Sequence, residues 1–148
     1  MYGHALPEIK KTPNGKPYFP GAPHIYFSLS HARTHVLCAI SDCPVGVDIE
    51  SPRVINARTA AYFGSSEELA QFDPLELWVL KESYVKLLDA TLPAVKRFRF
   101  SRAADMIIPP EKSASSKLYR IGDCIAAASI YGKELPDKVE LSNISGIL

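Results

Sequence analysis

The stretch Val45-Gly46-Val47-Asp48-Ile49-Glu50 predicts a short β-strand that carries two carboxylates on one face. The remaining elements are best placed relative to this strand. Side chains two residues apart on a strand share a face, so Asp48 and Glu50 lie together while Val47 and Ile49 point into a core. Two carboxylates on one face repel each other unless a positive charge lies between them. A divalent cation with oxygen ligands is one solution, and a nearby lysine or arginine is the other.

Two further strands are predicted before this stretch. HIYFSLS (24–30) alternates in polarity, as a strand with one wet face does. HVLCAIS (35–41) is nearly all apolar, which is typical of a more fully buried strand. The residues between them, 31–34, are few enough to form a hairpin turn.

Helices are predicted after the central strand. Residues 54–63 and 65–72 fit two short helices. Asp73-Pro74 predicts the start of a longer helix over 75–88, because proline is favoured in a first turn. Its apolar residues form one face of that helix: 77, 80, 84, 87 and 88.

The rest of the chain completes an α+β domain. Residues 1–22 predict an extended arm, and the alternating KRFRFS (96–101) is typical of a strand. Residues 107–117 predict a loop, and 118–132 predict one or two strands. The tail from residue 133 carries little information. We therefore expect one α+β domain over the whole chain.

Composition narrows the classes of function. The chain has 148 residues, of which 47% are hydrophobic and 22% are charged, as in ordinary globular domains. Its net charge of +1 gives no overall attraction to nucleic acid. No apolar run approaches bilayer length and no signal peptide is evident, so we expect a cytoplasmic protein without membrane or nucleic-acid partners. Cys38 and Cys124 lie in apolar runs and are expected to be buried.

The segment KESYVK (81–86) brings a third carboxylate. Glu82 and Lys86 are four residues apart, and the simplest interpretation is a solvated ion pair on the helix surface. The alternative is that Glu82 joins Asp48 and Glu50, flanked by Lys81 and Lys86, in a site for Mg²⁺ and a pyrophosphate.

Three stretches together, in this order, resemble the 4′-phosphopantetheinyl transferase superfamily, specifically its surfactin-synthetase-activating type. They are Gly15-Lys16-Pro17 with FSLSH (27–31), VGVDIE (45–50), and WVLKESYVK (78–86). The resemblance covers about residues 14–132. It implies that superfamily's fold, an antiparallel sheet packed against a long helix, with about one and a third of the two family pseudo-repeats. On this comparison 1–44 is the remnant of the first half, most of which is absent, and 45–148 is a second half that carries the metal site.

The resemblance implies a metal site and a catalytic set. Asp48, Glu50 and Glu82 would ligate Mg²⁺, with Mn²⁺ as the alternative ion, against the pyrophosphate of coenzyme A. Glu82, Lys86 and Glu67 would form the catalytic set, with Glu67 activating the acceptor serine. The other interpretation of Glu67 is an acid favoured by the dipole at a helix N-terminus.

The resemblance also implies a binding site for coenzyme A. Lys81 and Lys86 would contact its phosphates. Lys16, Ser30 and His31 would hold the nucleotide end, with His31 near the 3′-phosphate.

The implied reaction moves 4′-phosphopantetheine from coenzyme A to a serine of an apo acyl or peptidyl carrier protein and releases 3′,5′-ADP. Two alternatives stay open: a non-catalytic relative that binds coenzyme A or a carrier, and an unrelated Mg²⁺-dependent phosphodiester enzyme. Carriers are typically acidic, so a basic docking face is expected; its candidates are Lys96, Arg97, Arg99 and Arg102. Arg97 and Arg99 could equally form the wet face of a strand. By analogy with single-half members of the superfamily, we expect a homo-oligomer.

Overall fold

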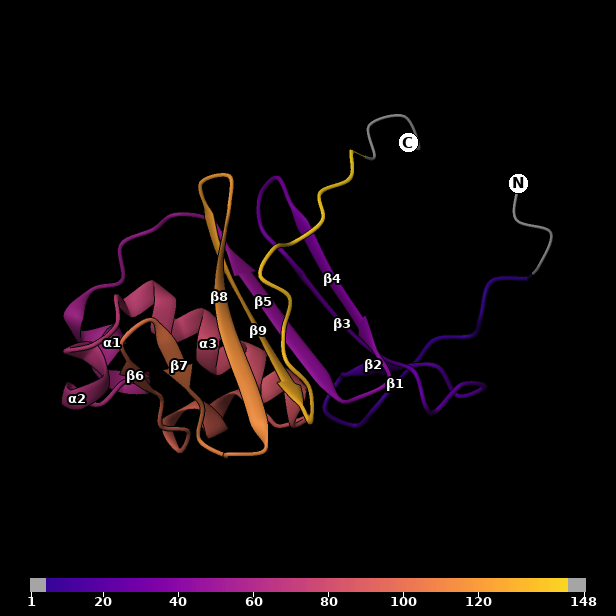
Figure 1. Cartoon of the computed structure of the whole chain (residues 1–148), viewed down its shortest axis with the longest axis horizontal. Helices are drawn as coiled ribbons and strands as arrows, with labels where there is room; N and C mark the ends of the chain where they lie inside the picture. The colour runs from indigo at the N-terminus through magenta and orange to yellow at the C-terminus, as the bar shows by residue number, and fades with distance from the viewer. Residues whose placement is uncertain (1–4, 144–148) are drawn as a thin grey trace.

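A three-stranded antiparallel sheet forms the centre of the fold in a computed structural model of the chain, which describes residues 5–143 (Figure 1). Its strands are β5 (Val45–Glu50), β9 (Cys124–Tyr131) and β8 (Ala114–Ile121), in the order β5-β9-β8. β5 has the predicted bounds, and the predicted one or two strands near the C-terminus are two. The α+β class is confirmed.

The helix α3 (Pro74–Leu87) packs against β5 and β9, behind the sheet in Figure 1. It begins where the sequence predicts, because the Asp73 side chain accepts a hydrogen bond from the Leu75 amide and Pro74 occupies the first turn. Two short helices precede it, α1 (Ala57–Phe63) and α2 (Ser66–Leu69). The predicted apolar face of α3 lies in the main core.

Glycine at position 46 allows β5 and α3 to lie unusually close together. A Cβ atom at Gly46 would be 2.0 Å from the Ser83 carbonyl oxygen and 2.3 Å from the Leu87 amide nitrogen. Both neighbours are backbone atoms of α3, so no side-chain adjustment could make room. The alternate residues of β5 on this face, Asp48 and Glu50, therefore project directly toward the helix.

The opposite face of β5 covers a second, smaller core. Val47 and Ile49 pack there with Leu37, Tyr119 and further buried residues of β8 and β9. The predicted division of the strand into an acidic face and an apolar face is therefore confirmed.

A hairpin of β3 (Tyr26–His31) and β4 (Val36–Ser41) lies beside β5 (Figure 1). The prediction that 35–41 is a fully buried strand is wrong: Val36 is 70% exposed and Ile40 is 69% exposed. Cys38 is also exposed, contrary to expectation, whereas Cys124 is buried as expected. Only one face of β4 meets β5 and the second core, and its outer face is uncovered among the described residues.

The remaining elements are short. They are β1 (Lys10–Lys11), β2 (Pro17–Tyr18), the 3-10 helix η1 (Leu92–Lys96), β6 (Ser101–Ala103) and β7 (Met106–Ile108). The strand predicted over 96–101 is wrong: η1 ends at Lys96, residues 97–100 belong to no strand, and β6 begins only at Ser101. Phe98 and Phe100 pack edge-on against Tyr84. The loop predicted over 107–117 instead contains the end of β7 and the start of β8.

Two expectations concern the chain as a whole: membrane-spanning segments and its division into two halves. Within residues 5–143 no helix combines the length and apolar character that crossing a bilayer requires. The division of the chain near residue 44 and the count of pseudo-repeats stay predictions.

Candidate functional site

Asp48 is the buried centre of the candidate site. Its Oδ1 accepts hydrogen bonds from the Ser30 hydroxyl at 2.9 Å and from the Lys86 ammonium at 2.9 Å. Its Oδ2 is buried and has no hydrogen-bond partner among the described residues. Burial raises the pKa of Asp48, although Lys86 and Ser30 oppose that shift.

Ser30 and its neighbour Ser28 join β3 to β5. The Ser30 hydroxyl accepts from the Ile49 amide at 3.2 Å, and the Ser28 hydroxyl accepts from the Val47 amide at 3.0 Å. In an ordinary β-sheet, the amides of one strand donate to backbone carbonyls of the next strand. Here the two serine hydroxyls accept these hydrogen bonds in place of backbone carbonyls. Ser30 therefore positions the Asp48 strand as well as donating to the carboxylate, and its predicted contact with the nucleotide end of coenzyme A stays a prediction.

Glu82 brings the second carboxylate, from α3. Its Oε1 is buried and has no hydrogen-bond partner in the described part of the chain. Burial, and to a smaller extent the negative charges of Asp48 and Glu50, raise the pKa of Glu82 to about 7, while Lys86 opposes that shift. The helix acid therefore lies within electrostatic reach of the two strand acids.

Glu50 lies on the same face but is bonded elsewhere. Its Oε1 accepts from the Trp78 indole nitrogen at 3.2 Å, and its Oε2 lies 3.5 Å from the Arg53 Nε. Over residues 5–143, no group of three or more histidine, cysteine, aspartate or glutamate side chains is arranged to hold a metal ion. A metal triad that includes Glu50 therefore stays a prediction.

Two orphaned carboxylate oxygens nevertheless suit a hard cation. Asp48 Oδ2 and Glu82 Oε1 are buried acceptors without donors, a costly state that a divalent ion with oxygen ligands would relieve. Lys86 lies 2.9 Å from Asp48 and supplies compensating charge, so the lysine considered in the sequence analysis is present beside the carboxylates, and the metal ion stays a prediction.

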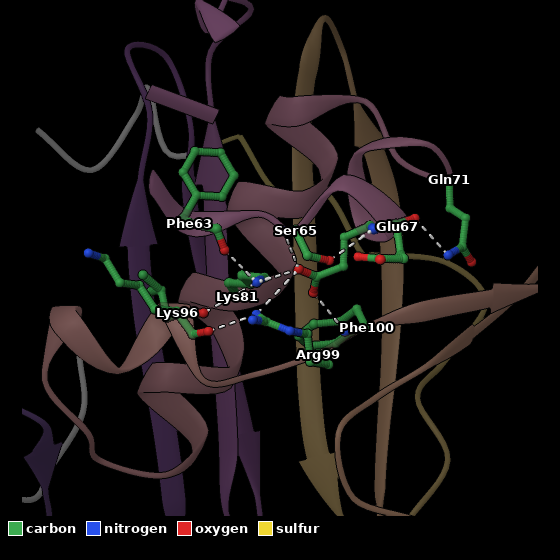
Figure 2. Close-up of polar contacts among 10 residues, drawn as sticks. Phe63, Ser65, Glu67, Gln71, Lys81, Lys96, Arg99 and Phe100 are labelled. Atoms are coloured by element: carbon green, nitrogen blue, oxygen red, sulfur yellow. Dashed lines mark hydrogen bonds and ion pairs between the residues drawn. The ribbon is translucent and has the colours of Figure 1, made fainter. Parts of the chain in front are cut away.

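Lys81 lies inside the fold, a placement that does not favour its predicted contact with coenzyme A phosphates, which stays a prediction. Its side chain is 0% exposed, and its ammonium donates to the Glu68 carboxylate at 2.9 Å and to the Phe63 and Val95 carbonyls. Figure 2 shows Lys81 enclosed by Phe63, Ser65 and Arg99. Three acceptors use all three ammonium hydrogens, so none is left for a phosphate.

Glu68, which the sequence prediction did not single out, is the partner that fixes this region. Burial alone would raise the pKa of Glu68, but hydrogen bonds from the backbone amides of Ser65 and Phe100 and from Lys81 outweigh burial and lower it. The signal in the sequence was the capping box of α2, in which Ser65 and Glu68 cap each other.

Lys16 also bonds to backbone carbonyls, and its predicted role at the nucleotide stays a prediction. Its ammonium donates to the carbonyls of Lys86 at 2.6 Å, Val45 at 3.1 Å and Leu87 at 3.2 Å. It thereby satisfies carbonyls at the C-terminus of α3, as lysines near helix ends often do. Burial lowers the pKa of Lys16, while Asp89 opposes that shift.

A cavity of about 240 Å³ lies where this arm meets α3, and Lys16, Ser28 and Lys86 are among its lining residues. A larger cavity of about 840 Å³ lies among β7, β8 and residues 134–137, but none of the predicted site residues lines it. The smaller cavity is the better candidate for a ligand, because it adjoins the ammonium that contacts Asp48.

His31 and Glu67 are exposed and lie apart from the contacts described so far. His31 is the last residue of β3. Glu67 is in the first turn of α2, where hydrogen bonds from its own amide and from the hydroxyls of Ser65 and Ser66 lower its pKa. This placement fits an acid at a helix N-terminus, and the catalytic role of Glu67 stays a prediction.

The candidate basic face is partly engaged in internal contacts; it consists of Lys96, Arg97, Arg99 and Arg102. The Lys96 ammonium lies 3.7 Å from the centre of the Tyr62 ring, and Arg102 forms an ion pair with Glu76 at 3.2 Å. Figure 2 shows Arg99 reaching back toward Lys96. Lys96, Arg97 and Arg99 remain exposed.

Comparisons with curated proteins give the class to which part of this chain is similar: the 4′-phosphopantetheinyl transferases. The resemblance inferred from the three motifs is thereby confirmed. Psf-1 of Bacillus pumilus is 37% identical over 99 residues, which cover 59% of this chain and 42% of the relative. Sfp of Bacillus subtilis (strain 168) is 35% identical over 82 residues, 49% of this chain and 37% of the relative. Gsp of Aneurinibacillus migulanus is 34% identical over 92 residues, 54% and 37% respectively.

The matches leave most of each relative uncovered. The chain spans about two fifths of the length of these transferases. No family model matches the sequence.

Proposed function

We propose that this chain transfers 4′-phosphopantetheine from coenzyme A to a serine of an apo acyl or peptidyl carrier protein, with Mg²⁺ or Mn²⁺, and releases 3′,5′-ADP. One observation carries the proposal: Asp48 and Glu82 keep buried, unpartnered oxygens beside the Lys86 ammonium, where Gly46 draws strand and helix together. The names of the similar proteins support the same reaction.

Each residue would have a separate task in this reaction. Asp48 and Glu82 would hold the ion, with Glu50 joining them if it leaves Trp78. A divalent ion at this place neutralises charge on a pyrophosphate and helps the leaving group. Lys86 would contact a phosphate at the cavity it lines.

The nucleotide end and the acceptor complete the proposed site. Ser30 and His31, at the end of β3, would hold the nucleotide end of coenzyme A. Glu67 would take the proton from the attacking serine hydroxyl of the carrier; the hydrogen bonds that lower its pKa make it a weaker base, so this role requires that the carrier change its surroundings. The exposed Lys96, Arg97 and Arg99 would attract an acidic carrier.

A second candidate function is a non-catalytic protein that binds coenzyme A or a carrier. It is favoured by the engagement of Lys16 and Lys81 with backbone carbonyls, which leaves fewer cations for phosphates than the resemblance implies. The buried oxygens of Asp48 and Glu82, which have no donor among the described residues, favour the transferase, because such oxygens destabilise a protein that binds no metal ion.

We also propose that the chain acts in the cytoplasm as a homo-oligomer. The outer face of the β3–β4 hairpin exposes Leu29, Val36 and Ile40, and a contiguous apolar face of this kind marks an interaction site. A second copy of the chain is the occupant that we propose. Sedimentation equilibrium at micromolar concentration tests this, and a stable monomer would exclude it.

One assay separates the candidate functions. The protein is incubated with coenzyme A, Mg²⁺ and an apo carrier protein, and the carrier is examined for the mass of phosphopantetheine. We expect addition in the wild type, loss with Asp48→Ala or Glu82→Ala, and retention with the exposed control Asp105→Asn. Binding of coenzyme A without addition would support the second candidate, and cleavage of coenzyme A without an acceptor would identify a phosphodiester enzyme.

A further inference from the structure

Lys86 contacts the same carboxylate that would bind the metal ion. Its ammonium lies 2.9 Å from Asp48 Oδ1, and this oxygen already accepts from Ser30. Lys86 also follows Glu82 by four residues on α3, so both project from one face of the helix, and its charge favours the ionised form of Glu82. One ammonium is therefore bonded to Asp48 and acts electrostatically on Glu82.

Lys86 differs from the other two lysines of the region in its freedom to move. The ammonium groups of Lys16 and Lys81 each donate to three acceptors. The hydrogen bond recorded for the Lys86 ammonium is the one to Asp48, and its side chain is 31% exposed at the edge of the cavity of about 240 Å³. Its long, flexible stem can therefore turn without breaking the fold.

A divalent ion and this ammonium cannot share Asp48 without cost. Like charges a few ångströms apart repel strongly where water is scarce, and Asp48 is only 8% exposed. An ion that binds Asp48 and Glu82 neutralises the carboxylates itself. The electrostatic attraction that holds the Lys86 ammonium at Asp48 is then lost.

We propose that Lys86 is an internal counter-ion that occupies the metal position in the metal-free protein, and that a divalent ion displaces it toward the neighbouring cavity. The inference rests on the proposed function for the identity of the site. It gives the displaced ammonium a place to meet a phosphate, so the metal and coenzyme A would bind cooperatively through this one side chain.

Metal titration of a variant tests the competition. Lys86→Met keeps most of the apolar stem and removes the charge. In the absence of coenzyme A, we expect this variant to bind Mn²⁺ more tightly than the wild type, by more than the about fivefold change that an exposed ion pair supports. The control Lys117→Met, which breaks a surface pair with Asp137, should bind Mn²⁺ as the wild type does. Equal or weaker Mn²⁺ binding by Lys86→Met would overturn the inference.

A second measurement uses the unaltered protein and does not depend on the folding of a variant. The side-chain NMR signals of Lys86 should shift as Mg²⁺ is added, while those of the fully buried Lys81 stay in place. Mg²⁺ binding that leaves the Lys86 signals unchanged would overturn this inference alone. Failure of the transfer assay with these metal responses intact would overturn the proposed function alone, and absence of any metal binding would overturn both.

Discussion

Gly46→Ala should damage the site without touching any of its polar groups. The added Cβ would lie 2.0 Å from the Ser83 carbonyl oxygen, so β5 and α3 would have to separate by about 1.4 Å to reach an ordinary contact of 3.4 Å. Forced overpacking of this kind typically costs about 1–3 kcal/mol, and the upper end applies here because both nearest atoms are backbone. The same separation carries Asp48 away from Glu82.

Two assays and one matched control read out this prediction. Urea unfolding should show a loss of about 3 kcal/mol in the free energy of unfolding, and Mn²⁺ titration under native conditions should show weakened binding. The control is Gly21→Ala, since a Cβ at Gly21 meets nothing within 4 Å. A Gly46→Ala protein with the stability and the Mn²⁺ affinity of the wild type would refute the claim that close strand–helix packing builds the site.

Three further predictions concern individual side chains. Because folding raises the pKa of Glu82 from 4.5 to about 7, the metal-free protein should lose stability as pH rises from about 4.5 through 7. The full shift corresponds to about 3 kcal/mol, solvent screening of this partly exposed group reduces the expected loss to roughly 2 kcal/mol, and Glu82→Gln should abolish it in pH-dependent urea unfolding. Lys81→Met should cost about 3–5 kcal/mol in thermal or urea unfolding because it removes the buried ammonium at 2.9 Å from Glu68 and leaves only the longer ion pair with Arg99, yet the folded fraction should keep its Mn²⁺ affinity; an unchanged stability would contradict the structural role. Ser30→Ala should cost about 1–3 kcal/mol and weaken Mn²⁺ binding, since the Ile49 amide loses its acceptor and Asp48 loses a donor; Ser113→Ala, at an exposed serine before β8, serves as the control.

The sequence predicted the elements that carry the site because their signals are local. The alternation of VGVDIE fixed the faces of β5, and Asp73-Pro74 marked the start of α3. The proximity of Glu82 to Asp48 came from the resemblance, and the raised pKa of Glu82 agrees with it. The predictions for β5, for the start of α3 and for the Glu82–Asp48 pair were made without knowledge of the tertiary contacts.

The two lysines of the helix motif could have been distinguished from the sequence. Lys81 and Lys86 are five residues apart, which at about 100° per residue places them about 140° apart around the helix axis. One helix face cannot present both to the same ligand. The spacing of four between Glu82 and Lys86 already indicated which lysine accompanies the acid.

Other placements could not be predicted from local patterns. Lys16 meets the C-terminal carbonyls of α3 across 70 residues of sequence, so only the tertiary fold reveals its acceptors. The exposure of Val36 and Ile40 depends on what covers the outer face of β4, and an apolar strand has the same composition whether or not a partner covers it.

Divalent-ion binding by Asp48 and Glu82 is tested most directly by Mn²⁺ titration of the purified chain, followed by calorimetry or electron paramagnetic resonance. We predict one ion bound per chain in the wild type, with binding lost in both Asp48→Asn and Glu82→Gln and retained in Asp105→Asn. Mn²⁺ binding that survives both substitutions, or a wild-type chain that binds no Mn²⁺ with coenzyme A present, would contradict the account.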